Sequence, residues 1–238
     1  SKIWTSGAED ADWIFCLVRT NGQGHKQKGI SFLLIDLRSP GIEIKPLIAF
    51  NGKRLWNQVF FEEVRVPIIH RLGDEDHGWT VAKSLLGDER LMVSRIAENK
   101  RVFSNLLELV THQGLRGQIL RGSFHSKLSQ ISIRIHALEM TSLRILGRAD
   151  KGSKVGAEPS MLKLKGSELV QSQDELLFEL VDYLSVPLDS SMGDHQSVGS
   201  PMTEYISSGA YHHRGYTIAG GSSEVQHNII DKQGLVVR

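Results

Sequence analysis

A single carboxylate interrupts the apolar side of a predicted helix, and it is the most informative residue of the chain. Glu89 lies in a helical stretch of about residues 79–112. The positions one turn to either side of it are apolar, namely Leu85, Leu86, Met92 and Val93. Residues three and four apart share a helix face, and a buried carboxylate is unfavourable by several kcal/mol unless it is paired. Glu89 is therefore either a structural partner of Arg90 or Arg95, or a general base activated by desolvation.

Two adjacent glycines precede a short helical signal near the end of the chain. Gly220 and Gly221 are followed by Ser223 and Gln226, whose S-x-x-Q spacing predicts a capping box at a helix start. One interpretation is a simple break and restart of the helix. The other is a ligand site, because residues without a Cβ let a ligand approach the backbone, and N–H groups at a helix start bind an anion or a carbonyl oxygen. The G-x-G-x-x-G spacing of a Rossmann site is missing.

An aromatic residue and two hydroxyls lie together at the start of the sequence. Trp4, Thr5 and Ser6 end a predicted strand, where they either pack and form a turn or stack on and hydrogen-bond a planar cofactor. Other kinds of site are excluded by pattern. The ten histidines show neither H-x-x-x-H nor H-E-x-x-H spacing, so we expect no metal site, and the G-x-S-x-G elbow of an α/β-hydrolase is missing.

Composition and charge are those of an ordinary globular protein. Of the 238 residues, 28 are Lys or Arg and 27 are Asp or Glu, so the formal net charge is +1, and neither a nucleic acid nor an anionic membrane is an expected partner. Cys16 is the only cysteine, which excludes an internal disulfide and favours a reducing compartment, so we expect a cytoplasmic protein. No apolar run approaches the roughly 18 residues of a membrane span. The sequence does not begin with Met, so we expect part of a longer protein.

Two kinds of scaffold must position these candidate residues. Up to about residue 72 the chain has short runs of strand-forming residues separated by polar turns, which predicts antiparallel strands. Helical segments follow over about 79–112, 124–146 and 159–184, then a loop to residue 201 and a last, interrupted helix. The predicted fold class is α+β. Residues 1–73 would form part of a β-barrel or sandwich, and residues 74–238 an antiparallel four-helix bundle.

The motifs resemble, in order and over nearly the whole chain, those of the acyl-CoA dehydrogenase family. The pieces that carry the resemblance are residues 2–8 with 11–13, 29–33, 40–42, 59–67 with 72–73, and 220–230. Residues 13–20 and 137–141 look most like the bacterial branch that includes the pimeloyl-CoA dehydrogenase large subunit. Each piece alone is a weak match to the family, but the pieces together and in order are specific.

The resemblance implies an α-helical N-terminal domain, a β-barrel and a C-terminal four-helix bundle, assembled around FAD as a homo-oligomer, either a dimer or a tetramer. The second half of the barrel and the bundle are the parts recognisable here. Carried over residue by residue, Trp4, Thr5 and Ser6 would contact the flavin, and Ser222 and Glu224 would lie beside the cofactor.

The implied reaction is the α,β-dehydrogenation of an acyl-CoA thioester, with an electron-transferring flavoprotein as the electron acceptor. Many family members place the base at the position that is Gly220 here. The isovaleryl- and long-chain-specific members instead look to have a glutamate just before an arginine on the first long helix of the bundle. Glu89 and Arg90 match that arrangement, so Glu89 is the predicted base. The residues predicted to bind the substrate are Arg90, Gly220 and Gly221. The backbone N–H of Gly220 would donate a hydrogen bond to the thioester oxygen.

Two other functions remain open within the same fold. The chain could be a non-catalytic subunit of a heteromeric assembly, although such a subunit has no reason to keep Glu89 on an apolar stripe. A DNA-associated branch of the family is disfavoured because the net charge is +1 and no basic tail is present.

Overall fold

Strands occupy the first part of the chain and helices the second, which confirms the predicted α+β class. The computed structural model describes residues 1–89, 94–111, 122–150, 156–182 and 201–234. The chain divides into two units, Ser1–Glu89 and Arg90–Arg238, and each is described by itself. The helix that follows residue 73 groups with the strands, and the domain boundary between residues 73 and 74 stays a prediction.

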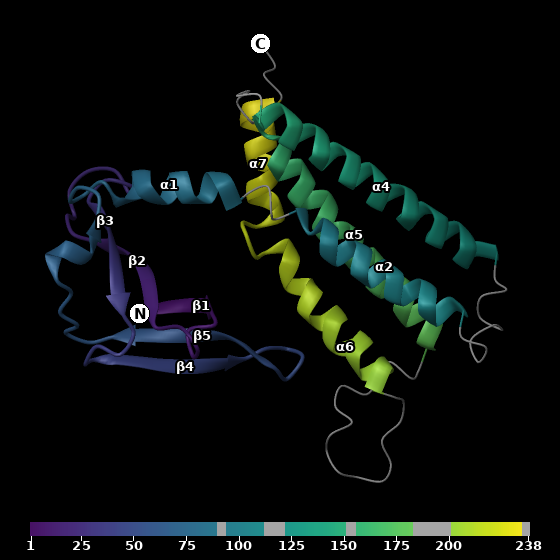
Figure 1. Ribbon diagram of the computed structural model, residues 1–238, viewed down its shortest axis with the longest axis horizontal. Coiled ribbons are helices and arrows are strands. Elements are labelled where there is room, and N and C mark those ends of the chain that lie inside the picture. Colours follow the sequence, from purple (N-terminus) through teal and green to yellow (C-terminus); the bar gives the residue numbers. More distant parts are fainter. Residues whose placement is uncertain (90–93, 112–121, 151–155, 183–200, 235–238) are drawn as a thin grey trace, which may run out of the picture. The chain divides into compact units, whose positions relative to one another are not determined.

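The first unit consists of two three-stranded sheets and one helix (Figure 1). Its elements are β1 (Lys2–Ser6), β2 (Trp13–Arg19), β3 (Ile30–Asp36), β4 (Ile42–Ile48), β5 (Arg54–Phe61), the 3-10 helix η1 (Ile68–His70), β6 (Arg71–Leu72) and α1 (Gly78–Glu89). One sheet has the order β1-β5-β4 and the other β2-β3-β6, and all pairs are antiparallel. The described strands do not close into a barrel, in agreement with the predicted partial barrel.

The apolar core of the first unit is small. Ala8, Leu37 and Val59 are buried together, and side chains of β2, β4 and β5 pack against them. Successive residues of a strand point to opposite faces, so Cys16 is buried whereas its neighbour Phe15 is 58% exposed. The β2-β3-β6 sheet therefore carries apolar side chains on its outer face as well as on its inner face.

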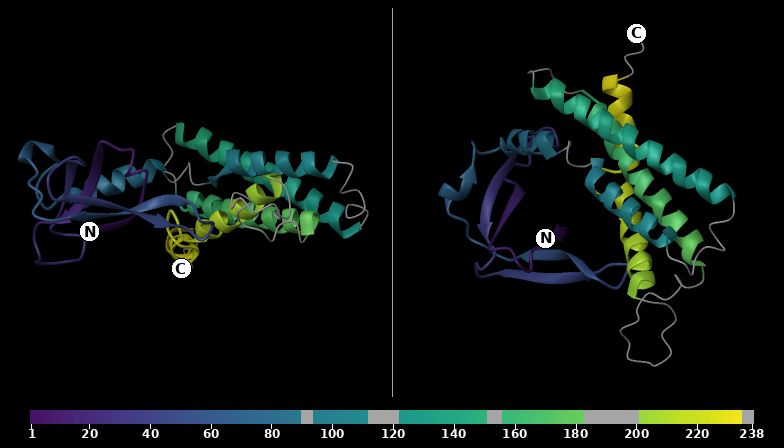
Figure 2. Two further views of the ribbon diagram at one scale, coloured as in Figure 1. Left: turned by 90° about the horizontal axis from the view of Figure 1, so that it is seen from below. Right: turned by 45° about the vertical axis from the view of Figure 1, so that its right-hand side comes forward.

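Helix α5 is the centre of the second unit. The helices described there are α2 (Ile96–Thr111), α4 (Gly122–Asp150), α5 (Glu158–Val181), α6 (Pro201–His213), the 3-10 helix η5 (Arg214–Thr217) and α7 (Ser223–Gly234). α2, α4, α6 and α7 all pack against α5, and Figure 2 shows α4 lying along it from two further sides. Because neighbours surround α5, side chains around most of its circumference are buried, including Leu162, Val170 and Leu180.

A break at Arg95 interrupts the single helical segment predicted over about residues 79–112. Arg95, directly before α2, has a positive φ of 52°, which no helix allows. Close packing against α5 explains this break, because a Cβ on Gly166 would lie 2.1 Å from the Ser94 carbonyl oxygen. The buried Asn99 amide also donates to the carbonyl oxygens of Arg95 and Gly166, at 3.0 and 3.1 Å. Packing between distant residues has overridden local helix propensity.

A buried ionic cluster joins α2, α5, α6 and η5. The imidazole of His213 lies between two carboxylates, with Nδ1 3.0 Å from both oxygens of Asp174 and Nε2 3.4 Å from Oε1 of Glu98. The Tyr216 hydroxyl donates to the same Glu98 oxygen at 2.8 Å. The Arg95 guanidinium lies 3.3 Å from the centre of the Tyr216 ring and 3.1 Å from Oε2 of Glu98. Each buried charge thus has an opposite charge beside it.

Burial and hydrogen bonding shift the pKa values of these groups in opposite directions. Burial alone would lower the pKa of His213, but hydrogen bonds with Asp174 and Glu98 outweigh it and raise that pKa to about 9. Burial alone would raise the pKa of Glu98, but hydrogen bonds with His213 and Tyr216 lower it to about 2. Burial raises the pKa of Asp174 in spite of its bond with His213. His213 is therefore a cation at neutral pH.

We predict that the second unit loses stability as the pH rises from about 6.5 to 9. A histidine whose pKa is raised on folding stabilises the fold fully below its unfolded pKa of 6.5 and loses that contribution as the pH passes its folded value of about 9. Since one pKa unit corresponds to about 1.4 kcal/mol, the loss in free energy of unfolding should be roughly 3 kcal/mol. Urea unfolding across this pH range measures it.

The His213→Gln variant should be less stable at pH 6.5 and should lose most of this pH dependence. His136, which is exposed on α4, provides the matched control, and His136→Gln should keep the wild-type slope. A wild-type free energy of unfolding that stays constant between pH 6.5 and 9 would contradict the prediction.

Candidate functional site

The predicted site residues lie in both units, and each group is described within its own unit. The first group comprises Trp4, Thr5 and Ser6 on β1 and Glu89 at the end of α1. The second comprises Gly220, Gly221, Ser222 and Glu224, which lead into α7 and begin it. Arg90 and the side chain of Glu89 lie outside the described residues.

Trp4 combines an unusual backbone conformation with an exposed ring. Its φ is +64°, a left-handed value that bulky residues rarely adopt. The register of β1 against β5 shifts between Lys2 and Thr5, so Trp4 lies in a β-bulge of this edge strand. The indole is 65% exposed and meets Trp56 edge-on, with 5.8 Å between the ring centres. Packing within the first unit thus leaves most of the ring exposed, and the role of Trp4 as a ligand contact stays a prediction.

Thr5 and Ser6 complete the end of β1. Ser6 is exposed and pairs with Trp56, whereas Thr5 is half-buried and pairs with Asn57. A hydroxyl two residues from an exposed indole can hydrogen-bond the polar edge of a planar ring that lies against that indole. The structure therefore brings an aromatic surface and a hydroxyl together at one strand end.

The backbone of Glu89 ends α1, and the apolar side predicted for this helix is only partly buried. Ala82 is buried, whereas Leu85 is 45% exposed. Met92 and Val93, the other half of the predicted stripe, lie outside the described residues. The role of Glu89 as a base stays a prediction.

The turn formed by Gly220 and Gly221 requires glycine at both positions. Their φ angles are +71° and +94°, a region that residues with a Cβ avoid. The buried Gln226 amide donates to the Gly220 carbonyl oxygen at 3.0 Å, and a Cβ on Gly221 would lie 2.5 Å from the nitrogen of that amide. Among the described residues, the Gly220 N–H has no hydrogen-bond partner. This donor is therefore available to a ligand, as the predicted contact with a thioester oxygen needs.

The predicted capping box at Ser223 and Gln226 is wrong by one residue. The Val225 N–H donates to Ser222 Oγ at 3.4 Å, so Ser222 caps α7. Ser223 Oγ instead donates to the Thr217 carbonyl oxygen at 3.3 Å, and Gln226 is bonded to the glycine turn. Both side chains of the expected box are thus engaged by the chain that enters the turn.

Charged groups act on one another at the start of α7. Glu224 is exposed there, and its own backbone N–H and the Ser222 hydroxyl lower the pKa of its carboxyl. On α5, Lys163 is 2% exposed, and its amine has no hydrogen-bond partner among the described residues. Burial lowers the pKa of Lys163 and Arg95 lowers it further, whereas Glu224 opposes the shift. Sequence reasoning missed Lys163, although a lysine inside an apolar helical run is the same kind of signal as Glu89.

The ionic cluster around His213 fixes the chain that enters the glycine turn. His213 ends α6, Tyr216 lies in η5, and Gly220 follows four residues after Tyr216. The cluster was not expected from the sequence. Asp174 could have been recognised, because it is an acidic residue in the middle of the apolar pattern of α5. Its partner in α6 is 39 residues away, and no local pattern connects the two.

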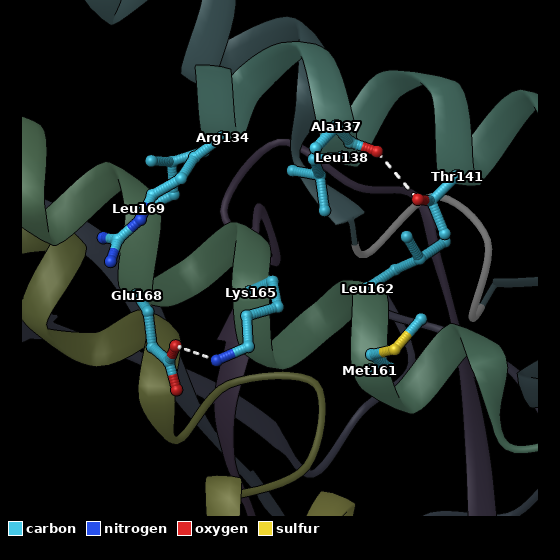
Figure 3. Close-up of a pocket in the computed structure, with 9 residues that line it drawn as sticks. All are labelled: Arg134, Ala137, Leu138, Thr141, Met161, Leu162, Lys165, Glu168 and Leu169. Carbon is cyan, nitrogen blue, oxygen red and sulfur yellow. Dashed lines mark hydrogen bonds and ion pairs between the residues drawn. The ribbon is translucent and has the colours of Figure 1, made fainter. Parts of the chain in front are cut away.

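A recess of about 410 Å³ lies between α4 and α5 (Figure 3). It is lined by Arg134, Ala137, Leu138, Thr141, Met161, Leu162, Lys165, Glu168 and Leu169. Lys165 pairs with Glu168 at 2.9 Å, and the Thr141 hydroxyl donates to the Ala137 carbonyl oxygen at 2.7 Å. These polar groups bond within their own helices, and none of the predicted site residues lines the recess.

The described parts of the chain contain neither a metal-binding cluster nor a membrane-spanning helix. Among the residues that the structure describes, no three or more His, Cys, Asp and Glu side chains are grouped so that they could hold a metal ion. Within the described helices, none has both the length and the apolar character that crossing a membrane requires.

Comparison with known proteins gives a family match. The family described as acyl-CoA dehydrogenase, C-terminal domain, matches residues 76–235. Acyl-CoA dehydrogenase FadE34 of Mycobacterium tuberculosis is 33% identical over 181 residues, which cover 76% of this chain and 25% of the relative. The chain thus spans a quarter of that curated relative.

Solved structures share the fold. The ChsE4-ChsE5 complex from Mycobacterium tuberculosis matches with a TM-score of 0.81 and 23% identity, over 100% of this chain and 60% of that chain. The FAD complex of PigA matches with a TM-score of 0.75 and 20% identity, over 95% of this chain and 57% of that chain. At these identities the likeness shows the fold.

We predict that Gly221→Ala destabilises the second unit. Its φ of +94° and the 2.5 Å approach of the Gln226 amide leave no room for a Cβ, and the strain should lower the free energy of unfolding by on the order of 1–3 kcal/mol. Gly215→Ala in η5 is the matched control, because no heavy atom lies within 4 Å of its added Cβ. Urea unfolding compares the two, and equal stabilities would contradict the prediction.

Proposed function

Because this chain belongs to the acyl-CoA dehydrogenase family, we propose that it is part of an FAD-dependent enzyme that introduces a double bond between the α and β carbons of an acyl-CoA thioester. The family match covers residues 76–235, which include the helices of the second unit. The chain spans only part of its relatives, so the activity is proposed for the complete protein.

The exposed indole of Trp4 is the observation that carries this proposal. A bulky residue held at a φ of +64° with 65% of its surface exposed does not serve the apolar core, and strained positions of this kind cluster at ligand sites. A flavin offers a planar ring for such an indole, and Ser6 can reach a polar edge of that ring. In the second unit, Ser222 and Glu224 begin a helix whose N-terminal N–H groups suit the carbonyl or phosphate groups of the cofactor. These residues fit FAD, the cofactor in the PigA complex of the same fold.

The residues of this chain would supply the proton transfer and the positioning. Glu89 takes the proton from the α-carbon. The available N–H of Gly220 donates to the thioester oxygen and stabilises the enolate charge that develops there. Arg90 and Gly221 are the proposed substrate-binding residues. When bound, FAD supplies the acceptor for the hydride that leaves the β-carbon, and an electron-transferring flavoprotein is the proposed partner for the electrons.

A heteromeric assembly is the second candidate. The chain matches, over its full length, one member of a complex whose name joins two proteins, ChsE4 and ChsE5. In such an assembly this chain could keep the fold and leave the chemistry to its partner. Glu89 favours the catalytic role, because a carboxylate among apolar residues has no evident use in a non-catalytic subunit. A homo-oligomer, the pimeloyl-CoA branch and a cytoplasmic location stay predictions.

In the complete protein, Glu89→Gln should keep FAD and substrate binding but slow flavin reduction by about 10²-fold or more, the scale of general-base catalysis. The amide has the shape of the carboxyl group but cannot take the proton. Anaerobic stopped-flow absorbance after mixing with acyl-CoA measures the rate. Asp88→Asn, a change of the same kind at the adjacent residue, should react at the wild-type rate. Rapid bleaching of the flavin in Glu89→Gln would place the base elsewhere.

The chain on its own should purify without stoichiometric FAD. The recognisable cofactor residues are few, and the resemblance implies that the first half of the barrel supplies many of the remaining flavin contacts. Flavin absorbance after gel filtration gives the ratio of FAD to chain. About one FAD per chain would show that Trp4, Ser6 and Ser222 with their neighbours suffice.

A further inference from the structure

Asn57 is a buried amide whose partners lie on the segment that carries Trp4 and Ser6. It is 1% exposed and stands opposite Thr5 in the register of β1 and β5. Its side-chain nitrogen donates to the Thr5 carbonyl oxygen at 3.2 Å and to a carboxylate oxygen of Glu9. An amide nitrogen has two hydrogens to donate. Both are used here, one in the strand and one in the turn that follows it.

The bulge of β1 needs an anchor of this kind. Lys2 pairs with Val59 and Thr5 with Asn57, so three steps along β1 match two steps along β5 and one residue is extra. The ladder is interrupted there, and the left-handed backbone of Trp4 is strained for a residue with a Cβ. A contact outside the regular ladder must hold this conformation. The bond from Asn57 does so at the residue next to Trp4.

The neighbour of Asn57 on β5 orients the indole itself. Trp56 pairs with Ser6, and its ring meets the Trp4 ring with 5.8 Å between centres and 81° between planes. This contact fixes one edge of the Trp4 indole while 65% of the residue stays exposed. Two consecutive residues of β5 thus hold the backbone and the ring of the bulge.

We propose that Asn57 is a positioning residue, which fixes the bulge of β1 so that Trp4 and Ser6 face the planar ring of the cofactor. The inference rests on the proposed function, in which that ring is a flavin. Asn57 does not touch the ring and acts through Thr5. An amide that served only the core would bond core groups, whereas the acceptors of Asn57 are the residue between Trp4 and Ser6 and a side chain of the turn that follows β1.

The test on this chain compares Asn57→Leu with Gln58→Met. Leucine has nearly the shape of asparagine but cannot donate, so the Thr5 carbonyl oxygen loses its side-chain partner. Gln58 is the next residue of β5 and points to the opposite face of the sheet. Gln58→Met also removes an amide from β5 and is therefore the matched control. The near-ultraviolet circular dichroism of the Trp4 and Trp56 ring pair, identified by its loss in Trp4→Phe, should disappear in Asn57→Leu and persist in Gln58→Met. Its persistence in Asn57→Leu would overturn the proposal.

A second variant keeps the test decisive if Asn57→Leu fails to fold. Glu9 is exposed, so Glu9→Ala removes one acceptor of the Asn57 amide without opening the core. This variant should fold and show a weakened ring-pair signal. An unchanged ring-pair signal in a folded Glu9→Ala variant would contradict the proposed positioning role of Asn57.

The test on the complete, FAD-loaded protein uses the FAD dissociation constant and the flavin absorption band. Asn57→Leu should weaken FAD binding about tenfold, as expected for one lost buried hydrogen bond, and should shift the band, whereas Gln58→Met should do neither. Trp4→Ala separates this inference from the proposed function. If Trp4→Ala impairs FAD binding and Asn57→Leu does not, the positioning role is overturned and the proposed function stands. If Trp4→Ala binds FAD like the wild type, the proposed flavin contact itself fails.

Discussion

The charge balance around His213 is the constraint on which the second unit depends. The imidazolium is 5% exposed and lies between Asp174 and Glu98, so without it the buried carboxylate of Asp174 would face the half-buried carboxylate of Glu98 with no cation between them. Arg95 and Tyr216 complete the balance from the other side of Glu98. Four of these residues come from α2, α5, α6 and η5, and Arg95 lies directly before α2, so this charge balance links four elements.

Two residues of this cluster, Arg95 and Tyr216, lie next to breaks of helical structure in the described part of the unit. Arg95 takes its left-handed backbone immediately before α2, where its guanidinium can lie on the Tyr216 ring. Tyr216 belongs to η5, and Thr217 of the same short helix accepts the bond from Ser223 that ties it to α7. The path of the chain into the glycine turn is thus set by contacts made well before it. The position of Gly220 and Ser222 is a consequence of the buried cluster and not of the turn alone.

Local patterns were enough for the fold class, whereas the predicted site residues came from local patterns together with the family resemblance and stay predictions. Period-two alternation and helical spacing gave the order of strands and helices, because both depend on residues only a few positions apart. They failed at Arg95, where the contacts that break the helix come from Gly166, and at the cap of α7, where Ser223 is engaged by Thr217. Tyr216 and Glu98 are separated by 118 residues, a distance over which no periodicity carries information. At Trp4 the sequence left packing and ligand contact open, and the left-handed backbone angle and the exposure of the indole are properties that no sequence pattern reports.

The left-handed backbone at Gly220 also restricts how this chain can change during evolution. The family resemblance implies that many members carry the base at this position, where this chain has a glycine with a φ of +71° whose carbonyl oxygen is bonded to Gln226. A glutamate introduced here would start from a strained conformation, so the substitution alone would not recreate the side-chain position that those relatives use. The turn would have to be rebuilt at the same time, including the contact with Gln226. A glutamate at position 220 with a relaxed backbone therefore requires several coupled substitutions and not a single one.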